Sequence, residues 1–460
     1  MIECAVMVPH PPIAVPEIGR GEEKKIQKTL DSFEEAAKFV ASFKPDTVVI
    51  TSPHATAYAD YFQISPGERA QGNFGQFRAP QVQFDIAYDT AFRKALVDEL
   101  EKAGFPGGTD YERMPQLDHG TMVPLYFLEK ELPDAQFVRI GLSGLPLSRN
   151  YELGELIARA AEKTGKRVAL IASGDLSHCQ KEDGPYGYKP EGPEYDRRIM
   201  EDMGQADFGK LFDYSPDFRE TAAECGHGSF AILAGAFDGQ DVKAKPLSHE
   251  DTFGVGYGFV EFTPEGPDEN RHFLKEYEHK AKKEIEDRIA KEDAYVALAR
   301  STINSYIKKE PIYVPENLPE EMEKEQAGVF VSIHENGQLR GCIGTIEPTK
   351  PNITEEILNN AVSASTRDPR FPAITVDELP YLDINVDVLA KPEPISSPDE
   401  LDVKKYGVIV TKGRKRGLLL PNLEGVDTIE QQIAIACSKA GLRPDEPGIQ
   451  LERFEVVRHV

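Results

Sequence analysis

The chain has 460 residues, of which 40% are hydrophobic and 28% are charged, a composition typical of folded proteins with one or more apolar cores. This length is sufficient for two or three domains. The formal net charge of −25 argues against a nucleic-acid-binding protein, because such proteins owe much of their affinity to Lys and Arg side chains that neutralise phosphates.

Five cysteines without a CxxC pair indicate no disulfide framework and favour a reducing cytoplasm. The first twelve residues, MIECAVMVPHPP, are apolar over too short a stretch for a signal peptide and lack its basic residues. No segment approaches the roughly 20 apolar residues of a membrane span. We therefore expect a cytoplasmic protein that binds neither nucleic acid nor membrane, and nothing in the pattern excludes an oligomer.

Residues 1–262 alternate apolar strand-like runs with amphipathic helical runs. This alternation is typical of an α/β domain with a mostly parallel sheet flanked by helices. A further alternating segment, Gly256–Phe262, predicts a closing edge strand. Strands are predicted at 4–8, 47–51, 81–88, 136–143 and 168–172, and helices at 21–43, 90–105 and 151–165.

Polar side chains follow the ends of three of these strands. His10 comes directly after the first strand, His54 after the second, and Asp175 and His178 after the strand at 168–172. Because ligands collect at the carboxyl ends of strands in open α/β sheets, we expect these side chains to form one site. A single histidine is more often structural than functional, so the prediction depends on their convergence.

Two imidazoles and one carboxylate on one face of an ion leave three coordination positions open. This is the arrangement of non-haem iron(II) oxygenases, which need open positions for substrate and dioxygen. A closed zinc site would use four Cys or His ligands, and no such set is spaced along this chain.

Five motifs resemble those of LigB-type class III extradiol ring-cleavage dioxygenases and the related Memo-like proteins across the first domain. They are VPHPP, TSPHA, LDHGTMVPL, SGDLSH and AECG. The resemblance implies that His10, His54 and Glu224 bind Fe(II), that His178 acts as acid and base, and that His119 contacts a ligand or the substrate. It also implies that the substrates are dioxygen and a small catecholic or aminophenolic ring.

The third metal ligand is open among Glu224, Cys225 and Asp175, in that order of preference. The Memo-like branch has a cysteine near the metal, and a thiolate favours copper or a redox-active iron site over ring cleavage, with zinc as a further alternative. Cys225 can equally be a small buried apolar side chain. The alternative function is therefore that of a Memo-like metal-binding or redox protein, or of a component of a modification system with a radical-SAM partner. A third possible function is that of an interaction module whose first domain is a degenerate scaffold.

The sequence changes character at Thr263. Residues 263–284 are dense in Lys and Glu and predict a charged helical linker. Residues 285–460 combine three helical segments with alternating strands and predict a smaller α+β domain with an antiparallel sheet. Its hairpin turns are predicted at residues 335–337 and 412–413.

Two motifs of this second domain, LRGCIG at 339–344 and STRDPRFPAI at 365–374, resemble those of the AMMECR-type domain, which is better known by its fold than by any reaction. Arginines of these motifs can bind a carboxylate or phosphate, and neighbouring arginines can activate a cysteine as a nucleophile. Cys342 can also be a strand residue facing the core. The candidate cleft comprises Arg340, Cys342, Arg367, Asp368 and Arg370.

Overall fold

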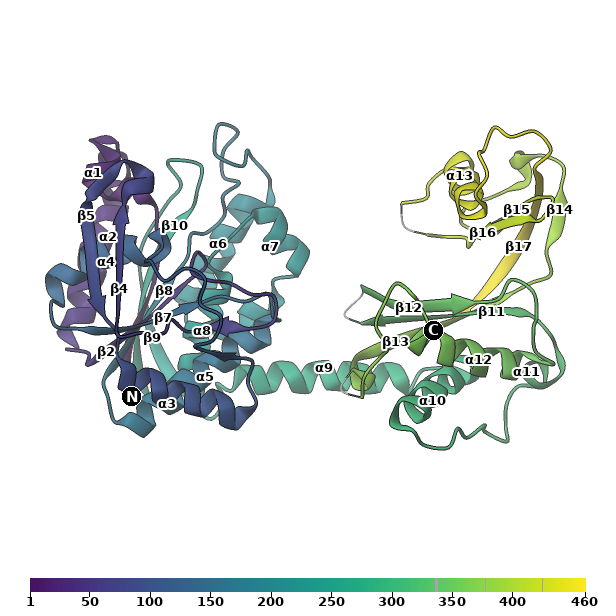
Figure 1. Cartoon of the computed structure of the whole chain (residues 1–460), viewed down its shortest axis with the longest axis horizontal. Helices are drawn as coiled ribbons and strands as arrows, with labels where there is room; N and C mark the ends of the chain where they lie inside the picture. The colour runs from purple at the N-terminus through teal and green to yellow at the C-terminus, as the bar shows by residue number, and fades with distance from the viewer. Residues whose placement is uncertain (336–337, 377, 424) are drawn as a thin grey trace. The chain divides into compact units, whose positions relative to one another are not determined.

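The computed structural model describes residues 1–335, 338–376, 378–423 and 425–460. The chain divides into two compact units, Met1–His279 and Lys280–Val460 (Figure 1). The first is an α/β unit and the second is built on an antiparallel sheet, so both predicted fold classes are confirmed. Of the turn predicted at 335–337, Glu335 ends β11 (Gly328–Glu335) and residues 336–337 lie outside the described residues, whereas the hairpin turn at 412–413 joins two paired strands.

A six-stranded sheet forms the centre of the first unit, in the order β7-β2-β8-β1-β10-β9 (Figure 1). The four strands β7, β2, β8 and β1 run parallel, and β10 and β9 are antiparallel to their neighbours. The strands are β1 (Ile2–Val8), β2 (Thr47–Ser52), β7 (Gln136–Gly141), β8 (Val168–Ser173), β9 (Gln240–Glu250) and β10 (Tyr257–Pro267).

Two apolar clusters fill the two faces of this sheet. Ala5 and Met7 of β1 belong to one cluster, and Val6 and Val8 belong to the other, as the period of two in a strand requires. Helices α3 (Thr90–Ala103), α5 (Leu147–Thr164) and α8 (His227–Ala236) contribute to the first cluster, and α2 (Gln27–Ser42) and α4 (His119–Glu131) to the second. Every residue of β2 and β8 is buried as a result.

The other elements of the first unit are short or peripheral. The helices are α1 (Pro16–Gly19), α6 (Glu191–Gly204) and α7 (Pro216–Ala222), and the strands are β3 (Phe62–Gln63), β4 (Arg69–Phe74), β5 (Ala79–Ala87) and β6 (Gly107–Gly108). Helix α9 (Phe273–Ile289) contains the boundary between the two units, so the predicted linker at 263–284 includes the end of β10 and much of this helix.

The prediction of an edge strand at Gly256–Phe262 was wrong. This segment forms most of β10, which lies between β1 and β9 inside the sheet. The edge strand on this side of the sheet is β9, which reads QDVKAKPLSHE, and only Val242 of it is buried. An edge strand with one open side does not need an apolar sequence, so a search for apolar runs misses it.

The second unit contains a seven-stranded sheet in the order β12-β11-β13-β17-β15-β16, with β14 beside β17. Helices α10 and α12 share one apolar cluster with β11 and β13, and α13 shares another with β15 and β16. The helices are α10 (Ala294–Lys308), α11 (Glu320–Lys324), α12 (Ile353–Thr366) and α13 (Ile429–Ala440). The strands are β11 (Gly328–Glu335), β12 (Gln338–Gly344), β13 (Leu382–Leu389), β14 (Glu393–Ile395), β15 (Tyr406–Lys412), β16 (Lys415–Leu419) and β17 (Gln450–His459).

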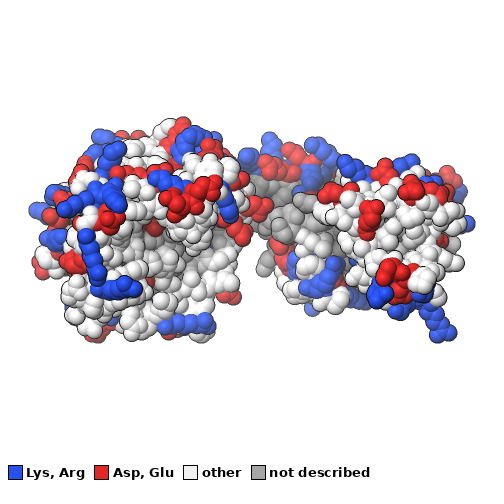
Figure 2. Space-filling view, turned by 90° about the horizontal axis from the view of Figure 1, so that it is seen from above, with Lys and Arg blue, Asp and Glu red and all other residues white. Residues whose placement is uncertain are grey.

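Acidic and basic side chains are interspersed on the face of each unit that Figure 2 shows, as expected for a solvated surface. Among the described residues, no helix combines the length and the apolar composition that crossing a membrane requires.

Helices α5 and α8 approach each other closely because both carry a glycine at their crossing. A Cβ atom on Gly235 would lie 1.8 Å from the carbonyl oxygen of Tyr151, and one on Gly154 would lie 2.1 Å from that of Ile232. The obstacle in both cases is backbone, which cannot turn away as a side chain can. Helix α8 begins two residues after Cys225, so this packing also supports the segment that carries the cysteine.

We predict that Gly235→Ala separates α5 from α8 and destabilises the first unit. Overpacking of this kind costs about 1–3 kcal/mol, which lowers the melting temperature of a unit of this size by roughly 2–5 °C. Differential scanning calorimetry of the full chain tests this prediction. An unchanged melting temperature would mean that α5 shifts freely on α8.

Candidate metal centre

Loops at the carboxyl edge of the sheet bring the predicted histidines together. His10 follows β1, His54 follows β2, and Asp175 follows β8, the strand that lies between those two. His119 joins them as the first residue of α4. The sequence-based expectation of convergence at this edge follows from the parallel pairing of these strands.

Two groups of potential metal ligands share His10. The nitrogens of His10, His54 and His119 form one group, and His10, Asp175 and Cys225 form the other, with all ligand atoms of a group within 4.8 Å of one another. His10 Nε2 lies 3.1 Å from His54 Nε2, 3.6 Å from Cys225 Sγ and 3.8 Å from Asp175 Oδ2.

These separations fit donors around a single ion. Zinc binds nitrogen at about 2.0–2.1 Å and sulfur at about 2.3 Å, so tetrahedral donors lie roughly 3.3 Å apart for two nitrogens and roughly 3.6 Å apart for nitrogen and sulfur. The observed distances from His10 Nε2 to His54 Nε2 and to Cys225 Sγ are close to these values. Each of these two pairs therefore has the spacing of two donors on one first-row transition metal, whereas His54 and Cys225 belong to different ligand groups.

The hydrogen bonds of Ser173 determine the tautomer of His10. Ser173 Oγ donates its only proton to the carbonyl oxygen of Gly120 at 2.6 Å. It must therefore accept the hydrogen bond from His10 Nδ1, which lies 2.9 Å away. The proton of the ring is on Nδ1, and the lone pair on Nε2 faces His54 and Cys225, which is the form that binds a metal.

Burial keeps the histidine rings neutral. Burial, followed by the nearby His54 and His119, holds the pKa of His10 well below its usual range, and His10 is only 1% exposed. Burial and the adjacent His54 lower the pKa of His119 to about 4. Burial also lowers the pKa of His54. Neutral imidazoles are metal ligands, so the site needs no deprotonation of histidine at neutral pH.

Asp175 and Cys225 are held against each other and against His10. The carboxylate of Asp175 accepts the backbone N–H of His10 at 2.8 Å, and the backbone N–H of Asp175 points at Cys225 Sγ at 3.3 Å. Burial raises the pKa of Asp175, and burial followed by Asp175 and Glu224 raises that of Cys225. A bound cation opposes both shifts because it favours the anionic forms.

His178 lies beside this group with one ring nitrogen available. Its Nδ1–H donates to the carbonyl oxygen of Ala223 at 2.6 Å, and Nε2 lies 4.0 Å from Asp175 Oδ2. The ring of Tyr186 meets its edge at 5.4 Å between centroids. The side chain is 20% exposed, so Nε2 can exchange a proton with a bound molecule.

The side chain of Glu224 is hydrogen-bonded to the first turn of α8, unlike those of the other predicted ligands. Its carboxylate accepts the backbone N–H of His227 at 2.7 Å in the first turn of α8 and lies 3.8 Å from Arg219. An acidic side chain is stabilised there by the unpaired N–H groups of the helix. Within the described part of the chain, neither group of potential ligands contains Glu224.

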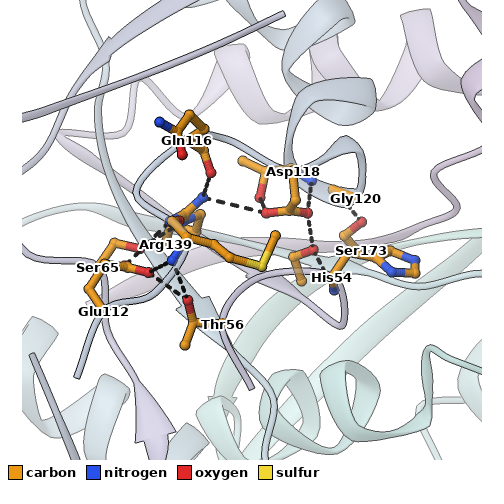
Figure 3. A network of polar contacts seen from close by, with 12 residues as sticks. His54, Thr56, Ser65, Glu112, Gln116, Asp118, Gly120, Arg139 and Ser173 are labelled. Atoms are coloured by element: carbon orange, nitrogen blue, oxygen red, sulfur yellow. Dashed lines mark hydrogen bonds and ion pairs between the residues drawn. The ribbon is translucent and has the colours of Figure 1, made fainter. Parts of the chain in front are cut away.

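Three residues near the histidines were not predicted as site residues. They are Ser52, Ser173 and Arg139, which form a buried polar network with Asp118 (Figure 3). Arg139 is 0% exposed in β7. A lone cation inside the otherwise apolar run QFVRIG was the available signal, because an arginine buried in a strand needs partners.

Among the second-domain candidate residues, Cys342, Asp368 and Arg370 contact one another directly. Asp368 accepts hydrogen bonds from the backbone N–H of Cys342 at 2.9 Å and from Arg370 at 2.7 Å, and Ser332 donates to Cys342 Sγ at 3.3 Å. Arg340 pairs instead with Glu378 at 2.7 Å. Arg367 lines a separate cavity beside α12.

Family models match both parts of the chain. The model described as the catalytic LigB subunit of aromatic ring-opening dioxygenase matches residues 4–260, and the AMMECR1 model matches residues 296–459.

Individual relatives cover the whole chain or one part of it. A protein of Clostridium acetobutylicum is 42% identical over 462 residues, which is 98% of each chain. A protein of Thermotoga maritima is 49% identical over 170 residues, 36% of this chain and 98% of its own. Among solved structures, an uncharacterized protein from Pyrococcus horikoshii is 35% identical, covers 36% of this chain and 88% of its own, and has a TM-score of 0.33.

We predict that the metal-free protein loses stability on acidification and that His119 contributes to this loss together with His10 and His54. The pKa of His119 is about 4 in the folded chain and about 6.5 in an unfolded chain, so the unfolded state takes up the proton first as the pH falls. The stability from the neutral ring is complete above about pH 6.5 and is lost toward pH 4.

The measurement compares urea unfolding of wild type and His119→Gln at pH 7 and pH 5 in the presence of a chelator. Wild type should lose about 1–2 kcal/mol more than the variant between these pH values. Equal losses would show that His119 is not one of the groups that take up a proton.

Proposed function

Because the chain belongs to the family of the catalytic LigB subunit of aromatic ring-opening dioxygenase, followed by an AMMECR1 domain, we propose that it is an Fe(II)-dependent extradiol-type dioxygenase. Its proposed substrates are dioxygen and a small catecholic or aminophenolic ring. The supporting observation is the placement of His10 Nε2 and His54 Nε2 at 3.1 Å, with His178 next to them. This site lies within the residues that the LigB model matches.

The histidines divide into two roles under this proposal. His10 and His54 hold the ion, with the Nε2 lone pair of His10 directed by its hydrogen bond to Ser173. Fe(II) supplies a Lewis acid for the two ring oxygens and an electron path to dioxygen. A carboxylate completes the ligand set: Asp175 lies 3.8 Å from His10 Nε2, whereas Glu224 would have to leave the first turn of α8.

His178 is the proposed acid and base. Its Nδ1–H is committed to the Ala223 carbonyl oxygen, so Nε2 is the nitrogen that accepts a proton from a substrate hydroxyl and returns it. Asp175 stabilises the protonated ring from 4.0 Å. The rings of His119 and Phe77 pack edge to face, with their centroids 5.6 Å apart. We propose that His119 contacts the substrate.

We predict that full-length protein loaded anaerobically with Fe(II) consumes oxygen with members of a panel of catechols and aminophenols and forms yellow ring-opened products. His178→Gln should lower the rate at least about 100-fold, as expected on loss of a general base, with unchanged iron content. The control is His279→Gln, an exposed histidine of α9. An absence of turnover across the panel by iron-loaded wild type would contradict the proposal.

A second candidate function follows from the distance between Cys225 Sγ and His10 Nε2. At 3.6 Å these atoms suit ligands of one ion, and a donor set that combines imidazole with thiolate is typical of copper, zinc or redox-active iron. The group of potential ligands that contains Cys225 also contains Asp175. The chain would then be a Memo-like metal-binding or redox protein, or a component of a modification system with a radical-SAM partner, without ring cleavage.

Ligand substitution distinguishes the two functions. Under the first, Asp175→Asn or Glu224→Gln abolishes Fe(II) binding and Cys225→Ser retains it. Under the second, Cys225→Ser weakens metal binding at least 10-fold and removes the sulfur-to-metal charge-transfer band of the Co(II) form, because serine is a poor ligand for these metals. Equilibrium dialysis and absorption spectra of the Co(II)-loaded variants give the measurement.

A further inference from the structure

Arg139 is buried in β7, and its guanidinium group contacts Ser65 and the segment that precedes α4 (Figure 3). Its Nε donates to Ser65 Oγ at 2.7 Å. Its two terminal nitrogens donate to the carbonyl oxygens of Gln116 at 2.7 Å and Met114 at 2.8 Å. They also lie 3.6 Å from Asp118 and 3.5 Å from Glu112.

These contacts fix the segment that leads into α4. A guanidinium group presents five N–H donors in one plane, so its contacts constrain both the position and the direction of the chain. Two backbone carbonyls and two carboxylates from residues 112–118 meet this single group. The backbone just before His119 therefore depends on Arg139.

Asp118 connects this segment to β2. Its Oδ1 accepts the hydroxyl of Ser52 at 2.5 Å and the backbone N–H of Thr121 at 3.0 Å, which caps the first turn of α4. Ser52 Oγ in turn accepts the backbone N–H of His54 at 3.2 Å. One carboxylate thus determines the start of the helix that carries His119 and the turn that carries His54.

The same turn of α4 reaches His10. The carbonyl oxygen of Gly120 accepts a hydrogen bond from Ser173 Oγ at 2.6 Å, and Ser173 Oγ accepts a hydrogen bond from His10 Nδ1 at 2.9 Å. A Cβ atom on Gly120 would lie only 2.4 Å from Ser52 Oγ and 3.2 Å from His54 Cδ2, so a shift of this turn moves its neighbours.

We propose that Arg139 is a positioning residue that, through Asp118, sets the relative placement of the imidazoles of His10, His54 and His119. This inference rests on the proposed function in one respect only, namely that these imidazoles bind a metal. Arg139 acts through the first turn of α4 and does not itself touch the metal or the substrate.

A purely structural role for Arg139 makes a different prediction from a positioning role. Asp118 and Glu112 both face Arg139 at similar distances, but only Asp118 continues to Ser52 and the first turn of α4. Glu112 instead accepts a hydrogen bond from Thr56. Asp118→Asn and Glu112→Gln each remove one charge with little change in shape, so they form a matched pair.

The first measurement is hydrogen exchange of the metal-free full-length chain. We expect Asp118→Asn to increase exchange in the peptides around 52–56 and 117–122, because an amide is a weaker partner for Arg139 than a carboxylate. Glu112→Gln should leave exchange around 117–122 at the wild-type level. Equal effects of the two substitutions at 117–122 would overturn the inference.

The second measurement is Co(II) affinity together with the visible spectrum of the Co(II) form. Asp118→Asn should weaken Co(II) binding about 10–100-fold and shift the spectrum, as substitutions behind metal ligands commonly do, with Glu112→Gln near wild type. Arg139→Lys, which keeps the charge but loses the planar fork, should be no better than Asp118→Asn. Wild-type affinity and spectrum in a folded Arg139→Lys would overturn the inference.

The two outcomes separate this inference from the proposed function. If wild type binds Co(II) but opens no ring, the dioxygenase proposal fails and the positioning role is still decided by the affinities. If wild type binds no Co(II), the metal centre itself fails, and the matched pair in hydrogen exchange decides the role of Arg139.

Discussion

The crowding of imidazoles in a space largely closed to water is the constraint on which the rest of the site depends. His10, His54 and His119 have ligand nitrogens within 4.8 Å of one another, and His10 is almost completely buried. Protonation of one ring there is opposed by burial and by the neighbouring rings. Burial also raises the pKa of Asp175 and of Cys225, and a cation bound beside them would favour their anionic forms.

The sheet and α4 supply these groups in different ways. His10, His54 and Asp175 follow parallel strands and meet at one edge because β8 lies between β1 and β2. His119 has no strand before it and is positioned by the first turn of a helix. Arg139 holds that turn in place through its ion pair with Asp118, the residue that caps the helix. Removing one partner of a buried ion pair typically costs about 3–5 kcal/mol, so such a pair also holds the geometry around it.

The sequence allowed prediction of the parallel sheet and of the histidines at its edge, because each leaves a local pattern. It did not distinguish Glu224 from Cys225, since adjacent residues point in directions that only the backbone decides. Ala223 adopts a left-handed conformation with φ of 52°, after which Glu224 turns to the first turn of α8 and Cys225 to His10. The partners of Arg139 were equally hidden, because Glu112 and Asp118 lie more than 20 residues before it in the sequence.

The chemistry of the site depends on how many of the nearby donors bind at once. Bidentate binding of a catechol and binding of dioxygen together need three open positions on the ion. A six-coordinate ion leaves them only if three protein ligands bind. A tetrahedral ion held by His10, Asp175 and Cys225, the group of potential ligands that contains the thiol, leaves one position, which suits binding of a single small ligand and not ring opening. Under the proposed function, ring opening therefore requires that the thiol of Cys225 remain outside the coordination sphere while a carboxylate binds as the third protein ligand.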